Sequence, residues 1–281
     1  MYKRQVLRRV GLAPKRSFGQ NFLVAEHVVE RIARACVPDD EVGRARVLEL
    51  GAGLGVLTGA LAARAARVVA VERDRDLVPV LGDELAEEIA DGRVVIVEGD
   101  AQQVEPAALL GDAEPGSPRV LAGNLPYQIT GRLLERAVHH AETCERVVFM
   151  VQLEVAERLV AEPATKAYGA LTVFIRAAFE VTKLFDVSPA SFHPPPEVTS
   201  AVVRLDARRP RVADETATFR SVVKAAFGMR RKTLRNAWGR VAAPAVLEQA
   251  ARTAGVSLDA RGETLEVDAF ARMAAALDAS T

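Results

Sequence analysis

The chain has 281 residues, of which 49% are hydrophobic and 26% are charged, an ordinary composition for a folded protein with room for one large and one small domain. Charged residues interrupt its apolar runs well before they reach membrane-spanning length, and no apolar signal region opens the sequence, so we expect no membrane partner and a cytoplasmic location. Cys36 and Cys144 lie far apart and outside any C-x-x-C spacing, which argues against a disulfide framework or a zinc site.

The formal net charge of zero hides a segregated distribution of basic residues. Residues 1–25 and 216–243 hold 13 Lys and Arg and no acidic residue, whereas the rest of the chain carries 24 bases against 37 acids. These bases are Lys3, Arg4, Arg8, Arg9, Lys15 and Arg16, and then Arg220, Lys224, Arg230, Arg231, Lys232, Arg235 and Arg240. They form either two unconnected solvated faces or a bipartite footprint for nucleic-acid phosphates.

The hydrophobic pattern over residues 26–151 predicts helices that alternate with strands. The expected strands cover 46–50, 68–72, 94–98, 120–123 and 147–151, and the expected helices cover 26–37, 56–64, 74–90 and 130–141. Parallel neighbouring strands need crossover connections, so this alternation predicts an α/β fold with a doubly wound, mostly parallel sheet.

The pattern changes from residue 171 onward. Two β-prone runs, 171–181 and 199–205, flank a proline-rich segment and predict an antiparallel edge hairpin. After Asp214 the chain is rich in alanine and helical in pattern. We therefore expect an α/β domain over 1–207, which includes the basic N-terminal segment, and a small all-α domain over 208–281.

A glycine-rich turn, Gly51-Ala52-Gly53-Leu54-Gly55, follows the first expected strand and opens a helix, as a nucleotide-binding loop does. Glu72 follows Gly51 by 21 residues, at the end of the second strand, where a carboxylate can accept hydrogen bonds from ribose hydroxyls. Asp100, at the end of the third strand, could accept from an adenine amine or could cap a helix. This set suits a nicotinamide dinucleotide nearly as well as S-adenosylmethionine, and a tight turn with a surface glutamate is the structural alternative.

The segment Asn124-Leu125-Pro126-Tyr127 ends the fourth strand and should face the same crevice. A proline that ends a strand and a tyrosine in the core would leave Asn124 unexplained. Adenine chemistry explains all four residues, because the carbonyl of Asn124 and the backbone carbonyl of Leu125 or Pro126 could accept both hydrogens of the weakly nucleophilic 6-amine. Tyr127 could stack on a flipped base. Such a reaction needs no general base, and the sequence offers no Ser-His-Asp arrangement or clustered metal ligands.

At these motifs the chain resembles the bacterial small-subunit rRNA dimethyladenosine transferases, the KsgA/RsmA family, over nearly its whole length. The resemblance rests on motifs in the same order: KRSFGQNFL at 15–23, LELGAG at 48–53, ERD at 72–74, EGDA at 98–101, GNLPY at 123–127, KAYG at 166–169, SFHPPPEV at 191–198, SAVVR at 200–204 and RRKTLRN at 230–236.

This resemblance implies a Rossmann-like class I methyltransferase domain with a seven-stranded sheet, S-adenosylmethionine as cosubstrate and no metal. It also implies dimethylation of two adjacent adenosines in a hairpin loop near the 3′ end of 16S rRNA, within the 30S subunit or its precursor, linked to late small-subunit biogenesis. We expect a monomer. The residues implied are Asn21, Leu23, Gly51, Gly53, Glu72, Asp100 and Asn124 on the cofactor, Phe192 opposite Tyr127 in the base pocket, and Arg230, Arg231, Lys232 and Arg235 on RNA.

Two residues depart from the family pattern: Ala52 replaces a common proline, and Gln128 replaces a common asparagine. Two alternative functions stay open. A nicotinamide-dependent oxidoreductase would share the first half of the sheet but gives no role to Asn124. An RNA-binding assembly factor with little catalysis would keep the fold and the basic segments.

Overall fold

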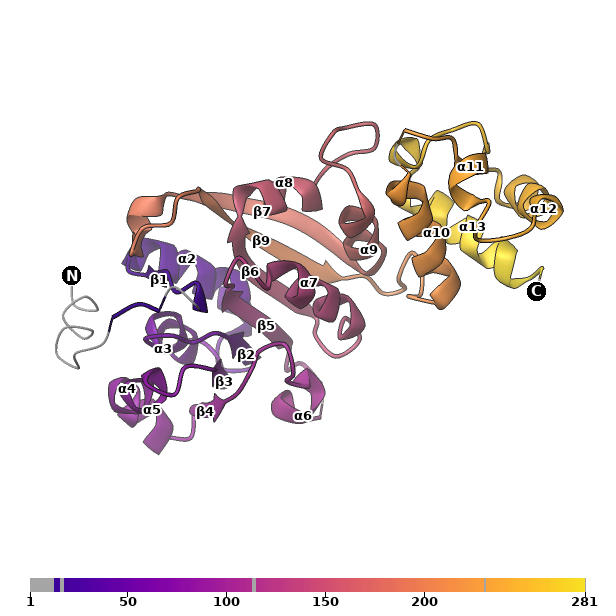
Figure 1. Ribbon diagram of the computed structural model, residues 1–281. Helices are drawn as coiled ribbons and strands as arrows, with labels where there is room; N and C mark the ends of the chain where they lie inside the picture. The colour runs from indigo at the N-terminus through magenta and orange to yellow at the C-terminus, as the bar shows by residue number, and fades with distance from the viewer. Residues whose placement is uncertain (1–12, 16–17, 113–114, 230, 281) are drawn as a thin grey trace. The chain divides into compact units, whose positions relative to one another are not determined.

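The computed structural model describes residues 13–15, 18–112, 115–229 and 231–280 (Figure 1). The chain divides into two compact units, one of Met1–Ala156 with Thr182–Asp206 and one of Glu157–Val181 with Ala207–Thr281. The second unit therefore takes in residues 157–181, which the expected boundary near residue 207 places in the first domain. Among the described residues, no helix is long and apolar enough to cross a membrane.

A seven-stranded sheet carries the strand order β4-β3-β2-β5-β6-β9-β7. Its strands are β2 (Arg46–Leu50), β3 (Arg67–Glu72), β4 (Val94–Glu98), β5 (Arg119–Asn124), β6 (Arg146–Gln152), β7 (Phe179–Val187) and β9 (Ser200–Ala207). Strands β2 to β6 are parallel, and β9 pairs antiparallel with β6. The mostly parallel sheet expected from the sequence is confirmed.

The order of the strands reverses at β2, which has β3 on one side and β5 on the other. In open α/β sheets ligands bind beyond the carboxyl ends of the strands at such a reversal. Strand β2 is buried along almost its whole length, and its register places Leu50 beside Val71 of β3. The sheet topology therefore directs the ends of β2, β3 and β5 toward one crevice.

Helices in the first part of the chain pack around the sheet (Figure 1). They are α2 (Glu26–Cys36), α3 (Val56–Ala62), α4 (Leu77–Glu84), α5 (Ala86–Ala90), α6 (Pro106–Leu110), α7 (Thr130–His139) and α8 (Leu153–Leu159). Helix α2 buries one apolar face, which includes Val28, Val29 and Ile32, at the spacing that predicted it. The single helix expected over 74–90 is divided at Leu85, which ends α4 and precedes α5.

A second, two-stranded antiparallel sheet joins β1 (Phe22–Leu23) to β8 (Phe192–His193). It brings a segment near the start of the chain beside the proline-rich segment, with Leu23 opposite Phe192. Short 3-10 turns lie at Asp39–Glu41, Pro189–Ser191 and Gly262–Thr264.

The second unit is built from α9 (Ala170–Ala178), α10 (Ala217–Gly228), α11 (Leu234–Trp238), α12 (Pro244–Ala254) and α13 (Val267–Asp278), with the start of β7. Its core holds the large buried side chains of Trp238 and Phe270. The indole nitrogen of Trp238 donates to the carbonyl oxygen of Val222 over 2.8 Å, which satisfies its one polar group.

The expected strand over 171–181 is wrong for most of its length, since residues 170–178 form helix α9 and β7 begins only at Phe179. Residues such as Val173 and Phe174 favour strands locally, but here they are buried on a helix within the core of the second unit. Thr172 supports the helix start, because its hydroxyl accepts a hydrogen bond from the backbone N–H of Gly169. Tertiary packing overrides local propensity in this segment.

Candidate functional site

A cavity with about 970 Å³ of empty space, counting its open mouth, lies beyond the carboxyl ends of β2, β3, β4 and β5. The lining includes residues from the glycine-rich turn, from the ends of β3 and β5, and from the segment that precedes β1. Of the expected site residues it contains Asn21, Gly51, Gly53, Glu72, Asp100, Asn124, Leu125, Pro126 and Tyr127.

The glycine-rich turn adopts backbone conformations that favour glycine. The φ angles are +81° at Gly51, +58° at Gly53 and +72° at Gly55. A Cβ atom at Gly55 would lie 2.7 Å from Leu81 Cδ1, so this position also needs the absence of a side chain. Ala52 donates its backbone N–H to the carbonyl oxygen of Val71 over 3.1 Å, a bond that the proline common at this position cannot make.

Glu72 lies at the end of β3 with only 8% of its surface exposed. Its Oε2 accepts a hydrogen bond from the Gly53 N–H over 2.7 Å, and its Oε1 accepts from the Asp74 N–H over 2.8 Å. Burial raises the pKa of Glu72, and these backbone donors oppose that shift. Each carboxylate oxygen has a second lone pair with which it can accept a hydroxyl of a ligand.

Asp100 lines the cavity just beyond β4. Its Oδ1 accepts a hydrogen bond from the backbone N–H of Gln102 over 2.9 Å, and its Oδ2 lies 3.6 Å from an Arg73 guanidinium nitrogen. The helix-cap interpretation is wrong, because residues 101–103 form a turn and the next helix, α6, begins at Pro106. Asp100 caps this turn through one oxygen and still lines the cavity.

Asn124 is the last residue of β5, and its side chain is held by the N-terminal part of the chain. Its amide Nδ2 donates to the backbone oxygen of Asn21 over 3.0 Å, which fixes the orientation of the amide. The preceding Gly123 permits this placement, since a Cβ atom there would lie 2.6 Å from the backbone oxygen of Leu50. The carbonyl oxygen Oδ1 of Asn124 is then the acceptor that its amide retains.

The next two residues differ in how their carbonyl groups are used. The oxygen of Pro126 accepts hydrogen bonds from the Ile129 N–H and the Thr130 hydroxyl, each over 3.1 Å, at the turn that opens α7. Among the residues that the structure describes, none donates to the carbonyl oxygen of Leu125.

Tyr127 lines the cavity, and its hydroxyl lies 2.8 Å from the hydroxyl of Ser200 on β9. Burial raises the pKa of Tyr127, so the phenol is neutral at physiological pH. Ser200 is completely buried, and its bond to Tyr127 holds the phenolic oxygen in position.

Two expected site residues do not line this cavity. Phe192 is only 1% exposed and packs in the core of the first unit, with its backbone paired to Leu23. Leu23 lines a smaller neighbouring cavity together with Gly53 and Asn124.

The structure adds residues that the spacing of polar residues did not reveal. Phe18, Gln20, Arg73 and Gln128 all line the cavity. The centroid of the Phe18 ring lies 5.5 Å from the Lys15 ammonium and 5.5 Å from the Arg73 guanidinium, so two cations lie within cation–π range of this ring. For Phe18 and Gln20 the only signal was the family motif over 15–23, whereas Arg73 lies in the motif over 72–74 and Gln128 is one of the two departures from the family pattern.

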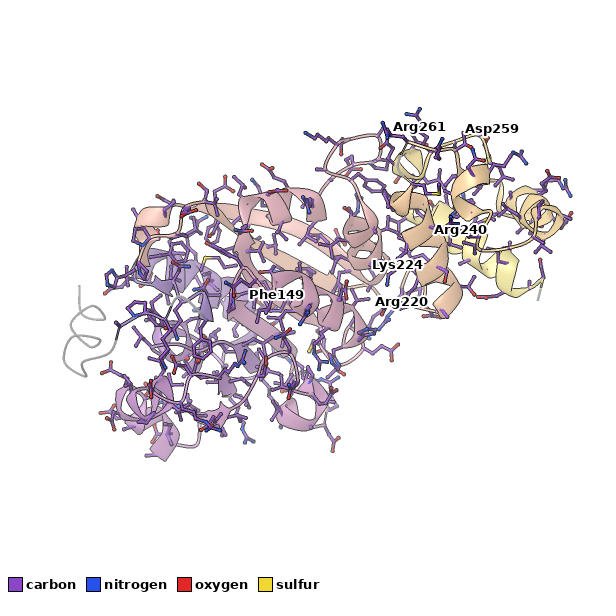
Figure 2. The ribbon with its side chains drawn as sticks, in the orientation of Figure 1. Phe149, Arg220, Lys224, Arg240, Asp259 and Arg261 are labelled. Carbon is purple, nitrogen blue, oxygen red and sulfur yellow. The ribbon has the colours of Figure 1, made fainter. Side chains whose placement is uncertain are left out.

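The basic residues of the second unit differ in their environments. Arg231 and Lys232 are exposed, whereas Arg235 pairs with Glu248 over 3.0 Å and lies 3.9 Å from Asp259. Figure 2 shows Arg220 and Lys224 along α10 and Arg240 beyond α11. Lys224 and Arg240 are exposed, whereas Arg220 pairs with Glu215. Arg230 and the first-segment residues Lys3, Arg4, Arg8, Arg9 and Arg16 lie outside the described residues.

The polar groups that line the cavity fit an adenosyl ligand. The carboxylate of Glu72 suits a ribose diol, that of Asp100 suits an adenine amine, and the positive φ angles at Gly51 and Gly53 let the backbone approach closely. No cluster of three or more possible metal ligands occurs among the residues described. The sheet topology, this pocket and the amide at the end of β5 together fit the class of S-adenosylmethionine-dependent methyltransferases.

Comparison with known proteins places the chain more closely. It belongs to the ribosomal RNA adenine dimethylase family, whose model matches residues 11–279. A relative from Anaeromyxobacter dehalogenans strain 2CP-C, ribosomal RNA small subunit methyltransferase A, is 45% identical over 283 residues, which cover 98% of this chain and 97% of the relative.

Two solved structures share the fold. A dimethyladenosine transferase from Plasmodium falciparum superposes with a TM-score of 0.73 at 23% identity, covering 90% of this chain and 95% of that one. The 23S rRNA methyltransferase ErmE superposes with a TM-score of 0.67 at 29% identity, covering 92% and 100%. The Rossmann-like fold is therefore that of the family.

Proposed function

We propose that the protein transfers methyl groups from S-adenosylmethionine to the 6-amino groups of two adjacent adenosines in a hairpin loop near the 3′ end of 16S rRNA. The name of the 45% identical relative and the family match support an rRNA adenine substrate. The observation that carries the proposal is the fixed amide of Asn124 at the rim of an adenosyl-binding cavity.

Two acceptors for the amine hydrogens belong to this proposal. Asn21 holds the nitrogen of the Asn124 amide, which leaves Oδ1 to accept one hydrogen. The carbonyl of Leu125 suits the second, because that of Pro126 already accepts two hydrogen bonds. Acceptance of both hydrogens favours a pyramidal nitrogen whose lone pair is available for attack. Tyr127, whose hydroxyl is held by Ser200, can stack on the base.

S-adenosylmethionine supplies an electrophilic methyl group on a sulfonium. The bond from the adenine nitrogen to the methyl carbon forms as the bond from that carbon to sulfur breaks. The resulting ammonium is acidic enough to lose its proton to water, so the site needs no general base. This agrees with the residues that follow Asn124 in the cavity lining, Leu125, Pro126 and the neutral phenol of Tyr127, none of which is a carboxylate or an imidazole.

The role implied for Phe192 stays a prediction. Contact with a target base would require this ring to leave the packing in which it is 1% exposed. The roles of Leu23 and Asn21 at the cofactor also stay predictions, although Asn21 lines the cavity.

The RNA partner is proposed to be 16S rRNA within the 30S subunit or its precursor. Arg231 and Lys232 support this proposal because their side chains are exposed. Arg235 contributes less in our proposal, because two carboxylates offset its charge. A monomeric protein, a cytoplasmic location and a role in late small-subunit biogenesis belong to the same proposal.

Methyl transfer by the Asn124→Ala variant tests this function. With under-methylated small subunits as substrate, the wild-type protein should incorporate radiolabelled methyl groups, and the variant should lose incorporation while it still binds RNA. RNA binding without methyl transfer by the wild type would favour an assembly factor. Titration of nicotinamide fluorescence checks the oxidoreductase alternative, since preferential binding of that cofactor would contradict the proposal.

A further inference from the structure

The carboxylate of Asp74 is buried beside the cofactor cavity without lining it. Asp74 follows Glu72 by two residues and is 3% exposed. Its Oδ1 accepts from the Lys15 ammonium over 2.5 Å and from the Asp76 N–H over 3.2 Å, and its Oδ2 accepts from the Gln20 amide over 2.7 Å. Both oxygens of this buried carboxylate therefore bind side chains that precede it by more than 50 residues.

Gln20 lies within a segment that we call the strap, residues 18–23, and Lys15 precedes this segment. The side chain of Gln20 joins Lys15 to Asp74. Its Oε1 accepts a hydrogen bond from the Lys15 backbone N–H over 2.7 Å, and its amide nitrogen donates to Asp74. The strap continues into β1, whose Leu23 pairs with β8. The strap is thus fastened at Asp74 on one side and at β8 on the other.

The strap also holds the side chain of Asn124. Asn21 directly follows Gln20, and its backbone oxygen accepts the amide of Asn124 over 3.0 Å. On the other side of Gln20, Gly19 has a φ of +62°, and a Cβ atom there would lie 3.9 Å from Pro126. Gln20, which binds Asp74, is therefore the direct neighbour of Asn21, whose carbonyl oxygen orients the Asn124 amide.

The charge of Asp74 is maintained despite its burial. Burial disfavours the ionised carboxylate, but the hydrogen bonds from Lys15 and Gln20 outweigh this and lower the pKa of Asp74. An ionised acceptor makes stronger hydrogen bonds than a neutral one, so this fastening is stronger than a contact between neutral groups.

We propose that Asp74 is a positioning residue, which fixes the strap so that the Asn21 carbonyl presents the Oδ1 of Asn124 to the substrate amine. The catalytic half of this inference rests on the proposed function. Without the anchor, the Asn21 carbonyl is no longer held in place, and the Asn124 amide can rotate to direct its NH₂ group at the amine. Phe18 and Gln20 also line the cofactor cavity, so loosening of the strap weakens cofactor binding as well.

A purely structural role for Asp74 is the alternative, because its carboxylate and carbonyl oxygens also bind the Asp76 and Leu77 N–H groups at the start of α4. Asp76 provides a matched control. It is 56% exposed and lies 2.6 Å from the same Lys15 ammonium, but among the described residues it has no bond to Gln20. Replacement of Asp76 thus removes a charge from Lys15 without releasing the strap.

The experiment compares Asp74→Ala, Gln20→Leu and Asp76→Asn in the full chain. Three quantities are measured for each variant. Hydrogen–deuterium exchange of residues 18–23 is followed without ligand, and the affinity for S-adenosylmethionine is measured by calorimetry. The third quantity is kcat for methyl transfer at saturating cofactor and RNA. We expect faster exchange in the strap, about tenfold weaker cofactor binding and a further loss of about tenfold in kcat for Asp74→Ala and Gln20→Leu, since each loses a hydrogen bond involving a charged group. Asp76→Asn should stay within about twofold of the wild type.

Unchanged exchange and affinity in Gln20→Leu, or in a folded Asp74→Ala, would overturn the inference even if thermal stability falls. A double variant gives a direct check: Asp74→Asn with Gln20→Glu restores an amide–carboxylate pair and should recover strap protection that Asp74→Asn alone loses. If the wild type binds S-adenosylmethionine but methylates no RNA, the proposed function fails, while exchange and affinity still decide whether Asp74 fixes the strap.

Discussion

Replacement of Gly123 by alanine should impair catalysis more than folding. The new Cβ atom would lie 2.6 Å from the backbone oxygen of Leu50 and 3.1 Å from Leu125 Cδ2. An ordinary carbon–oxygen contact is at least about 3.3 Å, so β5 must move by roughly 0.7 Å relative to the end of β2. Because Asn124 directly follows Gly123, its Cα atom moves with β5. A displacement of about 1 Å at a reacting group can lower the rate by as much as ~10²-fold.

We therefore expect Gly123→Ala to lower kcat for methyl transfer by at least about tenfold, with a stability loss of about 1–3 kcal/mol from overpacking. Gly82→Ala in α4 is the matched control, because a Cβ atom there meets nothing within 4 Å. Its helical position should make that variant slightly more stable and equally active. Steady-state kinetics and denaturant unfolding measure both quantities. A kcat for Gly123→Ala equal to that of the wild type would refute the argument that this close approach places Asn124.

Three further outcomes follow from the site and its surroundings. Ser200→Ala removes the hydroxyl that fixes Tyr127, so kcat should fall severalfold while S-adenosylmethionine affinity, measured by calorimetry, is unchanged; equal kcat would remove Ser200 from the account. Burial raises the pKa of Glu49 to about 8, so the folded chain keeps a proton that the unfolded chain loses near pH 4.5, and stability falls as pH rises between these values. Glu49→Gln should abolish that decline, so the free energy of unfolding at pH 9 should exceed that of the wild type by on the order of a few kcal/mol. Denaturant unfolding at several pH values measures it, and a pH profile equal to that of the wild type would contradict the prediction. Replacing Arg231 and Lys232 by alanine should reduce the slope of log affinity against log salt by about 0.7–0.9 for each lost phosphate contact, whereas an unchanged slope would show that they face solvent.

The parts of the fold that short-range pattern determines were predictable from the sequence. Strand β2 covers the expected residues 46–50 and β4 the expected 94–98, because buried runs bounded by turns mark parallel strands. The glycine-rich turn and Glu72 lie where their spacing predicts, since a strand, a turn and a helix form one local unit.

The contacts that complete the site were not predictable in the same way. The bond between Tyr127 and Ser200 joins residues 73 positions apart, and that between Asn124 and Asn21 joins residues 103 apart. Residue spacing carries no signal for such pairs, so only the family motif pointed to the segment around Asn21. Helix α9 was missed for a related reason, because burial in the second unit outweighs the strand propensity of Val173 and its neighbours.

Mass mapping of methylated adenosines in 16S rRNA tests the central claim most directly. Under-methylated small subunits are incubated with S-adenosylmethionine and either the wild-type protein or Asn124→Ala. The account predicts two adjacent dimethyladenosines near the 3′ end of 16S rRNA with the wild type and neither with the variant. Absence of both modifications with the wild type, or equal modification by the variant, would contradict it.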